Sequence, residues 1–326
     1  MDLFDKCRVE IVEKATAENV YPYFHQIESK QAPEVIMEGS RRIMLGSNNY
    51  LGLTSNPDVI AAGVRALEKY GSGCSGSRFL NGTLDLHVQL ESELADFLNK
   101  EDVMTFSTGF QSNLGIISAI AGRGDYIFCD KENHASIYDG CKLSYAKTIR
   151  FNHSDMAHLE TALQSVPLES GKLIVTDGVF SMGGYMAGDK RVVNYVRHAS
   201  RPFIFCASIP PANCATAIES LHILRSHPEM PKRLVELAAY MRKGLLERGI
   251  AIRDSITPII PIYTYDEMRT LRKAKELFDA GVYVNPVLPP ATPPGESLLR
   301  TSYMANHTET ILDEALDIIE RIVKND

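Results

Sequence analysis

The feature that most constrains this chain is an alternation of short β-rich runs and helical patterns that begins near residue 100. Helical patterns occupy 109–121, the stretch from Ser136, and Met156–Gln164. The strand-like runs between them are VMTFS (103–107), DYIFCD (125–130), TIRFN (148–152) and KLIVTDG (172–178). Strands that alternate with helices indicate a parallel sheet covered by helices. We therefore predict an α/β fold with a doubly wound, mostly parallel sheet.

The alternation breaks after residue 178. Only SMGG (181–184) separates VTDGVF from YMAG (185–188), which also has the pattern of a short strand. Parallel neighbours need a crossover of about a dozen residues or more, which this connection does not supply. Either the two segments pair as an antiparallel hairpin, or a segment has been removed. Gly-Gly is a good hairpin turn, so the pattern alone slightly favours the hairpin.

The rest of the chain has a different organisation. Helices are expected at 189–198, from Pro210, at Pro231–Arg248, Glu267–Ala280 and 308–324, and strands at 203–208, 257–265, 282–287 and 298–304. The final third has the mix of a smaller C-terminal α+β domain. We place an N-terminal helix and arm at 1–45, a large domain at 46–228 and the small domain at 229–326.

Composition excludes several classes of protein. Lys and Arg total 34 against 41 Asp and Glu, without a basic run, which argues against nucleic acid as a partner. The six cysteines are scattered and no group has metal-ligand spacing, so reduced thiols in a cytoplasmic protein are expected. No signal peptide is apparent, and the longest apolar runs, such as LGIISAIAG (114–122), are too short for a transmembrane segment. If the substrate is lipid-like, the chain would have to bind it as a soluble or peripheral enzyme.

Two motifs follow predicted strands. FSTGFQSN (106–113) ends a strand in small residues and opens a helix, whose free N–H groups and dipole favour an anion. An ordinary capped turn has the same pattern and is more common. NHAS (133–136) puts a histidine where α/β folds place ligands. A histidine satisfied by local backbone is the plain alternative.

Two further segments stand out. GSGCSGSRFLNGT (71–83) is glycine-rich with Arg78 embedded, which suits close approach to a ligand or simply a flexible surface loop. LPPATPPGESLLR (288–300) is a stiff loop leading to a strand that presents Arg300. A guanidinium held in this way suits bidentate capture of a carboxylate, although a surface salt bridge is the common role of a single arginine.

Taken together and in order, these segments resemble the α-oxoamine synthase family of fold-type-I pyridoxal-phosphate (PLP) enzymes. The matching segments are SNNYLGL (47–53), GSGCSGSRFLNGT, FSTGFQSN, NHAS, DGVFSM (177–182), PPATPPG (289–295) and LLR (298–300). Within the family, VYPYFHQIES (20–29) and residues 76–91 are most similar to the serine palmitoyltransferase branch, and less similar to 8-amino-7-oxononanoate synthases. The resemblance implies a homodimer that condenses an amino acid with an acyl-CoA, with decarboxylation. In that branch the substrates are L-serine and palmitoyl-CoA.

The resemblance also implies site residues. Gly109 and Phe110 would hold the PLP phosphate, and His134 would stack on the pyridine ring. Ser181 would hydrogen-bond the ring oxygen. Asn49 would line the substrate pocket, and Arg300 would bind the amino-acid carboxylate.

The chain departs from the family at one place. Relatives continue DGVFSM into a helix, a strand with an Asp-x-Ala-His motif and a Thr-Phe-Ser-Lys motif, whereas here Met182 runs directly into Gly183. The absent block would hold the Asp that pairs with the pyridinium nitrogen and the Schiff-base Lys. Lys190 matches a surface helix start and does not replace it. The resemblance therefore implies missing central strands and a chain without a catalytic lysine. A non-catalytic binding or regulatory subunit is the alternative.

Overall fold

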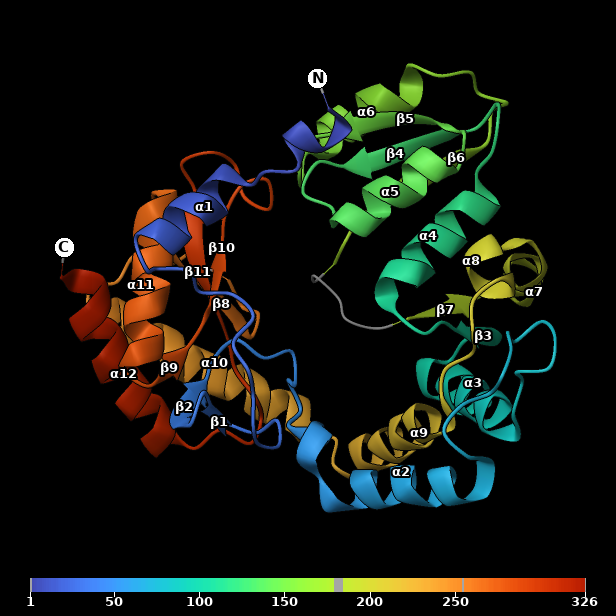
Figure 1. Ribbon diagram of the computed structural model, residues 1–326. Helices are drawn as coiled ribbons and strands as arrows, with labels where there is room; N and C mark the ends of the chain where they lie inside the picture. The colour runs from blue at the N-terminus through green and yellow to red at the C-terminus, as the bar shows by residue number, and fades with distance from the viewer. Residues whose placement is uncertain (1, 179–183, 254, 326) are drawn as a thin grey trace. The chain divides into compact units, whose positions relative to one another are not determined.

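The computed structural model describes residues 2–178, 184–253 and 255–325. The chain divides into two compact units, which are described separately. Unit 1 consists of Met1–Pro57 with Leu224–Asp326, and unit 2 consists of Asp58–Ile223 (Figure 1). The sequence analysis divided the chain at 45/46 and 228/229.

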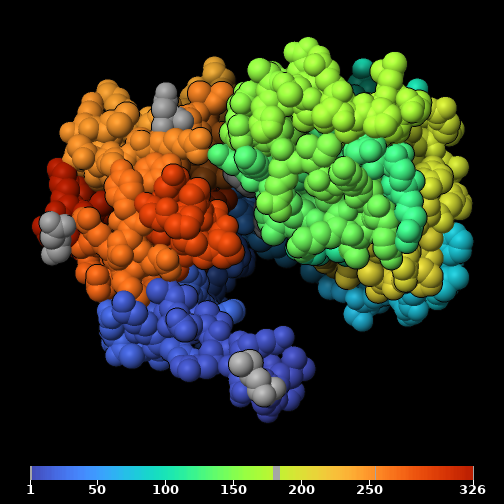
Figure 2. Space-filling model, turned by 90° about the horizontal axis from the view of Figure 1, so that it is seen from above, coloured from blue at the N-terminus to red at the C-terminus, as the bar shows by residue number. Residues whose placement is uncertain are grey.

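Unit 2 has the predicted alternation of strands and helices. After α2 (Pro57–Tyr70) and α3 (Asp85–Leu98), the chain forms β3 (Asp102–Thr105), α4 (Gly109–Ile120), β4 (Tyr126–Asp130), α5 (Ala135–Leu143), β5 (Lys147–Phe151), α6 (Met156–Gln164) and β6 (Lys172–Val175). Strands β5, β4 and β6 form one parallel sheet in that order. In Figure 2 the green segments of this part of unit 2 are closely packed. The predicted α/β fold is confirmed.

The hairpin between residues 172–178 and YMAG does not form in the described structure. YMAG is β7 (Tyr185–Gly188), and it pairs antiparallel with β3, whereas β6 pairs with β4. The strands of unit 2 therefore lie in two separate sheets, β3–β7 and β5–β4–β6. Val179–Gly183 fall outside the described residues.

Helix α4 packs against strands of both sheets. Ile117 contacts a cluster with Ile127 and Cys129 of β4. Ile116 and Ile120 pack instead against a cluster that includes Met104 of β3. A helix with apolar residues around its circumference is typical of a helix buried on several sides. Helix α4 thus connects the two sheets through their cores.

One predicted strand of unit 2 is wrong. Residues 203–208 were expected as a strand, but the chain forms the short helix α8 (Arg201–Ile204) and then irregular structure, after α7 (Lys190–Ala199). Pro202 stands in the first turn of α8, where its fixed φ and missing N–H are tolerated. Phe203 is buried with its ring edge-on to Phe106. Packing of one aromatic ring overrides the β propensity of FIF.

Unit 1 is built around an antiparallel sheet. Strands β10 (Asn285–Val287), β11 (Ser297–Ser302) and β8 (Ile259–Tyr265) form it in that order. A second sheet contains β1 (Glu34–Met37), β2 (Ser40–Met44) and β9 (Val282–Tyr283). Residues 282–287, predicted as a single strand, therefore contribute to two sheets.

Helices complete unit 1. They are η1 (Leu3–Lys6), α1 (Glu10–Ala17), η2 (Leu53–Ser55), α10 (Met230–Glu247), α11 (Glu267–Asp279) and α12 (Glu309–Lys324), while α9 (Pro211–Ser226) spans the division between the units. One large core cluster joins α10, α11 and α12 to β8 and β11. No helix of the described residues is long and apolar enough to span a membrane.

Candidate functional site

The turn between β3 and α4 presents free backbone donors. Thr108 caps α4, and its side chain accepts a hydrogen bond from the Gln111 N–H at 3.2 Å. Within the described chain, the N–H groups of Gly109 and Phe110 have no hydrogen-bond partner. Two free donors at the positive end of a helix dipole can accept an anion such as a phosphate.

The second motif, NHAS, places a histidine at the start of α5. The His134 ring is exposed, and its Nδ1 accepts a hydrogen bond from the Ser136 N–H at 3.2 Å. Ser136 Oγ lies 2.7 Å from the same nitrogen. These contacts place the proton of the neutral ring on Nε2 and fix the ring plane.

Asn113 links the two motifs. Its amide Nδ2 on α4 donates to Ser136 Oγ on α5 at 2.9 Å. Ser136 is buried, and it therefore joins the helix that begins at Gly109 to the ring of His134. The structure thus holds the phosphate turn and His134 in one hydrogen-bonded arrangement of unit 2.

Asn133 fixes the end of β6 next to this arrangement. Its side chain donates to the Val175 carbonyl at 2.8 Å and accepts from the Asp177 N–H at 2.8 Å. Nδ2 also lies 3.3 Å from Cys129 Sγ. Because both the Nδ2 and the Oδ1 of this buried amide are hydrogen-bonded, Asn133 holds the carboxyl ends of β4 and β6 in register.

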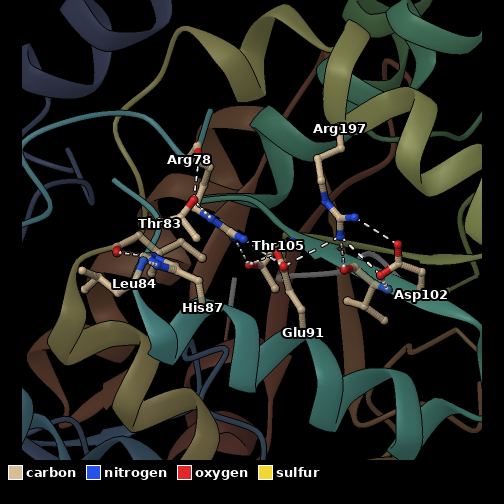
Figure 3. A network of polar contacts seen from close by, with 10 residues as sticks. Arg78, Thr83, Leu84, His87, Glu91, Asp102, Thr105 and Arg197 are labelled. Carbon is tan, nitrogen blue, oxygen red and sulfur yellow. Dashed lines mark hydrogen bonds and ion pairs between the residues drawn. The ribbon is translucent and has the colours of Figure 1, made fainter. Parts of the chain in front are cut away.

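A buried ion-pair network lies at β3, the strand that precedes the turn of Gly109 and Phe110 (Figure 3). Arg78 binds Glu91 through both carboxylate oxygens, at 2.7 and 2.9 Å, and both side chains are less than a tenth exposed. Glu91 Oε1 accepts from the Thr105 N–H at 2.8 Å. The last residue of β3 is therefore hydrogen-bonded to Glu91 of α3, which in turn binds Arg78 of the glycine-rich loop.

Two more charged groups extend the network along β3. Arg197 of α7 binds Asp102 at 3.0 Å and donates to the Val103 carbonyl at 2.8 Å. Its Nη2 lies 3.8 Å from Glu91 Oε2. Figure 3 shows the Glu91 carboxylate between the two guanidinium groups. Both ends of β3 are held by charge-assisted hydrogen bonds.

Unit 1 carries Arg300 on β11. One of its terminal nitrogens donates to Asn48 Oδ1 and to the Tyr50 hydroxyl, both at 2.9 Å. In the described part of the chain, no carboxylate lies within ion-pair distance of Arg300, and its other nitrogens have no partner. A half-buried guanidinium with neutral partners retains the capacity to bind a carboxylate.

Asn49 stands beside these partners of Arg300 in the sequence. Its Oδ1 accepts from the Thr54 N–H at 3.2 Å, while its Nδ2 is buried without a partner in the structure. Gly52 follows at φ 70°, and a Cβ there would lie 2.4 Å from the Asn306 side chain. This turn of the SNNYLGL segment therefore needs glycine at Gly52.

A cavity of about 310 Å³ lies elsewhere in unit 1. Its lining includes Ala15 of α1, Leu271 of α11, and Leu288 and Ala291 of the proline-rich loop, together with the rings of Tyr21 and Tyr23. None of the described residues that line it is charged, so it can bury an apolar group without ionic contacts.

The predicted site residues are thus partly assembled. Gly109, Phe110 and His134 lie in unit 2 and are connected through hydrogen bonds, and Asn49 and Arg300 lie in unit 1. Ser181 falls outside the described residues. The sequence analysis did not identify Asn113, Asn133 and Glu91 as supports of the site.

Every lysine of the chain lies in the described residues, so each is placed. At the carboxyl ends of β3, β4, β5 and β6, the nearest lysine in sequence is Lys131, which follows β4 directly. Its ammonium donates to Asn152 Oδ1 at 2.7 Å, and its residue is exposed. Lys190 begins α7, with its N–H bound to Glu101 at the opposite end of β3 from Thr105. Neither matches a buried amine beside a cofactor.

Comparison with known proteins identifies the family. The model of the family "Aminotransferase class I and II" matches residues 40–184 and 181–319. The chain belongs to this family. The two matched stretches meet at 181–184, where the alternation of strands and helices breaks. PLP is the cofactor of this family.

The most informative relatives are α-oxoamine synthases. Serine palmitoyltransferase from Bacteroides ovatus is 41% identical over 380 residues, covering 97% of this chain and 96% of the relative. The 8-amino-7-oxononanoate synthase from Thermoanaerobacter pseudethanolicus is 32% identical, covering 98% and 97%. The first alignment extends over 380 residues although this chain has only 326, so the relative contains a stretch that this chain lacks.

The solved structures that match this chain support the same family. Serine palmitoyltransferase from S. paucimobilis with a bound PLP–myriocin aldimine matches with a TM-score of 0.95 and 32% identity, covering 99% of this chain and 98% of that chain. The Sphingomonas wittichii serine palmitoyltransferase matches with a TM-score of 0.93. The predicted fold-type-I architecture is therefore confirmed.

PLP fits only one end of this site. The free N–H groups of Gly109 and Phe110 suit its phosphate, and the exposed His134 ring suits a planar group. None of the lysines that lie in sequence near the carboxyl ends of the strands of unit 2 is buried.

Proposed function

We propose that this chain is a form of a PLP-dependent serine palmitoyltransferase that lacks its central block and does not catalyse the reaction as it stands. The parent reaction condenses L-serine with palmitoyl-CoA and releases CO2 and CoA. The chain retains groups for anion and carboxylate binding, and it lacks the group that activates the cofactor.

One observation carries this proposal. Met182 is followed directly by Gly183, at the point where the two family matches meet, and β6 and β7 belong to different sheets. A lysine amine must stand beside the PLP aldehyde, with a lowered pKa, to form the covalent enzyme–cofactor bond. No lysine of the chain is buried at the carboxyl ends of these strands.

The substrates are inferred from the relatives and from unit 1. The 41% identity with a serine palmitoyltransferase favours serine and a long acyl-CoA. Arg300, whose hydrogen-bond partners in the described structure are neutral, supports an amino-acid carboxylate as a ligand. A homodimer in the cytoplasm is the corresponding assembly and location.

The test is chemical. PLP is added to the purified 326-residue protein, the visible spectrum is recorded, and the mixture is reduced with borohydride before the modified lysines are mapped. We expect scattered labelling of exposed lysines and no CoA release from palmitoyl-CoA and serine. The serine palmitoyltransferase of Bacteroides ovatus, treated identically, is the positive control. A single stoichiometrically labelled lysine in this chain, together with CoA release, would overturn the proposal.

A further inference from the structure

Strand β6 has an open hydrogen-bonding edge. In the parallel pairing of β4 with β6, Tyr126 lies opposite Lys172, and the Tyr126 N–H donates to the Gly171 carbonyl at 2.9 Å. The alternation of a parallel ladder then directs the N–H and C=O of Leu173 and Val175 towards β4. Those of Lys172 and Ile174 point away from it, and no described strand lies on that side.

Strand β7 has a second open edge. The Phe106 N–H donates to the Gly184 carbonyl, so Gly184, Met186 and Gly188 face β3 in the antiparallel ladder. The main-chain groups of Tyr185 and Ala187 therefore face outward, where no described strand pairs with them. Figure 1 shows β6 and β7 at edges of their sheets.

The side chains of β6 indicate which kind of segment could pair with this edge. Leu173 and Val175 pack on one face against the cluster of Ile127 and Cys129. Ile174 lies on the other face, opposite Phe128, and remains 48% exposed. A strand with apolar residues on both faces is typical of the interior of a parallel sheet, not of its edge.

The family match divides at this place, and a relative is longer than this chain. The two family matches meet at 181–184, directly before β7, and the Bacteroides ovatus relative contains a stretch without counterpart here. The chain nevertheless superposes on a solved serine palmitoyltransferase with a TM-score of 0.95 over 99% of its length. The frame around the absent block is therefore retained.

We propose that the edges of β6 and β7 form an acceptor site for a strand-forming polypeptide supplied by another chain. The occupant has an apolar run whose residues bury both faces and whose backbone pairs in parallel with Lys172 and Ile174. Its chemistry is that of the block that relatives carry between the counterparts of Met182 and Gly183. The inference rests on the absence of that block, as the proposed function does, but it requires no catalysis.

The probe is the polypeptide that the Bacteroides ovatus serine palmitoyltransferase has between these two positions, coexpressed with the full 326-residue chain. We expect the two to copurify in equal amounts. Amide hydrogen exchange at Lys172, Ile174, Tyr185 and Ala187 should slow by about tenfold or more, because new strand hydrogen bonds protect these groups. Absence of copurification, or copurification without this protection, overturns the inference.

Two substitutions on β6 form a matched pair. Ile174→Pro removes an N–H that points to the open edge and leaves the ladder with β4 intact, so copurification should fall by about tenfold. Ile174→Val keeps the N–H and should bind as the original chain does. If Ile174→Pro does not fold, Ala187→Pro makes the same test on β7. Equal binding by the proline and valine variants contradicts strand addition.

The remaining controls separate the possible occupants. The 326-residue chain alone is examined by exchange at low and high concentration. Protection of the same four amides by self-association assigns the edges to a second copy and overturns the proposed occupant. Borohydride labelling of the chain alone tests the proposed function independently, because it does not depend on whether the polypeptide binds.

Discussion

At the scale of single residues, Arg300 has the most direct consequence for substrate binding. Among the described residues its guanidinium hydrogen-bonds to the neutral side chains of Asn48 and Tyr50, which leaves its charge available for a carboxylate. In a version with the block restored, Arg300→Ala should raise KM for serine, since a charge-assisted contact contributes about 1.5–3 kcal/mol. Steady-state kinetics with serine as the varied substrate measure this. The variant Arg300→Lys keeps the charge but not the planar guanidinium, so its KM for serine should lie between those of the original protein and Arg300→Ala. Unchanged serine kinetics in Arg300→Ala would show that Arg300 is not part of the site.

The pair of Arg78 and Glu91 determines stability in unit 2. Glu91→Ala leaves the buried Arg78 without its bidentate partner, so the free energy of unfolding should fall by about 3–5 kcal/mol. Urea denaturation measures the change. The exposed pair of Arg8 and Glu13 is the control, and Glu13→Ala should leave the free energy of unfolding almost unchanged, because water screens this pair. Similar losses in both variants would contradict the role of burial.

His307 gives unit 1 a pH dependence. Burial lowers the pKa of His307 to about 4, from an ordinary value of 6.5. The folded state therefore favours the neutral ring. The stability that the neutral ring contributes is fully present above pH 6.5 and is lost as the pH falls from 6.5 towards 4. The loss amounts to about 3 kcal/mol. Unfolding measured across this range should show the slope.

The control for this titration is His307→Asn. In the original chain the Met304 N–H donates a hydrogen bond to His307 Nδ1 at 2.9 Å, and the Asn side chain keeps an acceptor for it. The variant should lose most of the slope between pH 6.5 and 4. Burial also lowers the pKa of His87, so a smaller slope of the same sign remains. An unaltered slope would assign the acid sensitivity to other groups.

The residues that the sequence revealed are those within continuous motifs. Gly109, Phe110 and His134 occur in short segments whose order is specific. Glu91, Asn113 and Asn133 have no such signal, because each is a single polar residue whose partner lies far away in the chain. Glu91 binds Arg78, 13 residues earlier, and Asn113 binds Ser136, 23 residues later. Only the folded arrangement shows that these side chains hold the phosphate turn and His134.

At the scale of elements, the contact between α4 and α5 depends on a glycine. A Cβ on Gly140 of α5 would lie 2.8 Å from the Asn113 carbonyl and 3.1 Å from the Ile117 side chain. Gly140→Ala should therefore destabilise the protein by about 1–3 kcal/mol, despite the better helix propensity of alanine. Thermal unfolding measures this. Gly122→Ala is the matched control, since its Cβ would meet nothing closer than 4.0 Å. Equal effects would show that the close approach is unimportant.

The elements themselves were largely predictable, and their pairing was not. Periodicity located α6 and α12 almost to the residue, because a long amphipathic pattern is a local property. It failed at residues 203–208, where the contact of Phe203 with Phe106 and the proline of α8 decide the conformation. The partner of β7 was also beyond the local pattern, since β3 lies about 80 residues earlier in the chain.

At the scale of the whole molecule, the two units should differ in stability. Unit 1 has one large buried cluster, which joins α10 and α12 to β8 and β11, and two smaller clusters that include Phe278 and Leu271. The core of unit 2 is divided among several smaller clusters, and its strands lie in two sheets with open edges. Apolar burial is the main favourable contribution to folding, so divided cores open at a lower free energy.

Amide hydrogen exchange followed by mass spectrometry tests this difference peptide by peptide. We expect the slowest exchange in β8, β11, α10 and α12, and exchange faster by about tenfold or more in β3, β6 and β7, because local opening there exposes little apolar surface. Helix α4, which contacts both sheets of unit 2, should exchange more slowly than either edge strand. Binding of the strand-forming polypeptide should slow exchange in unit 2 without changing β8 and β11. Uniform protection across both units would mean that the absence of the block does not lower the stability of unit 2 relative to unit 1.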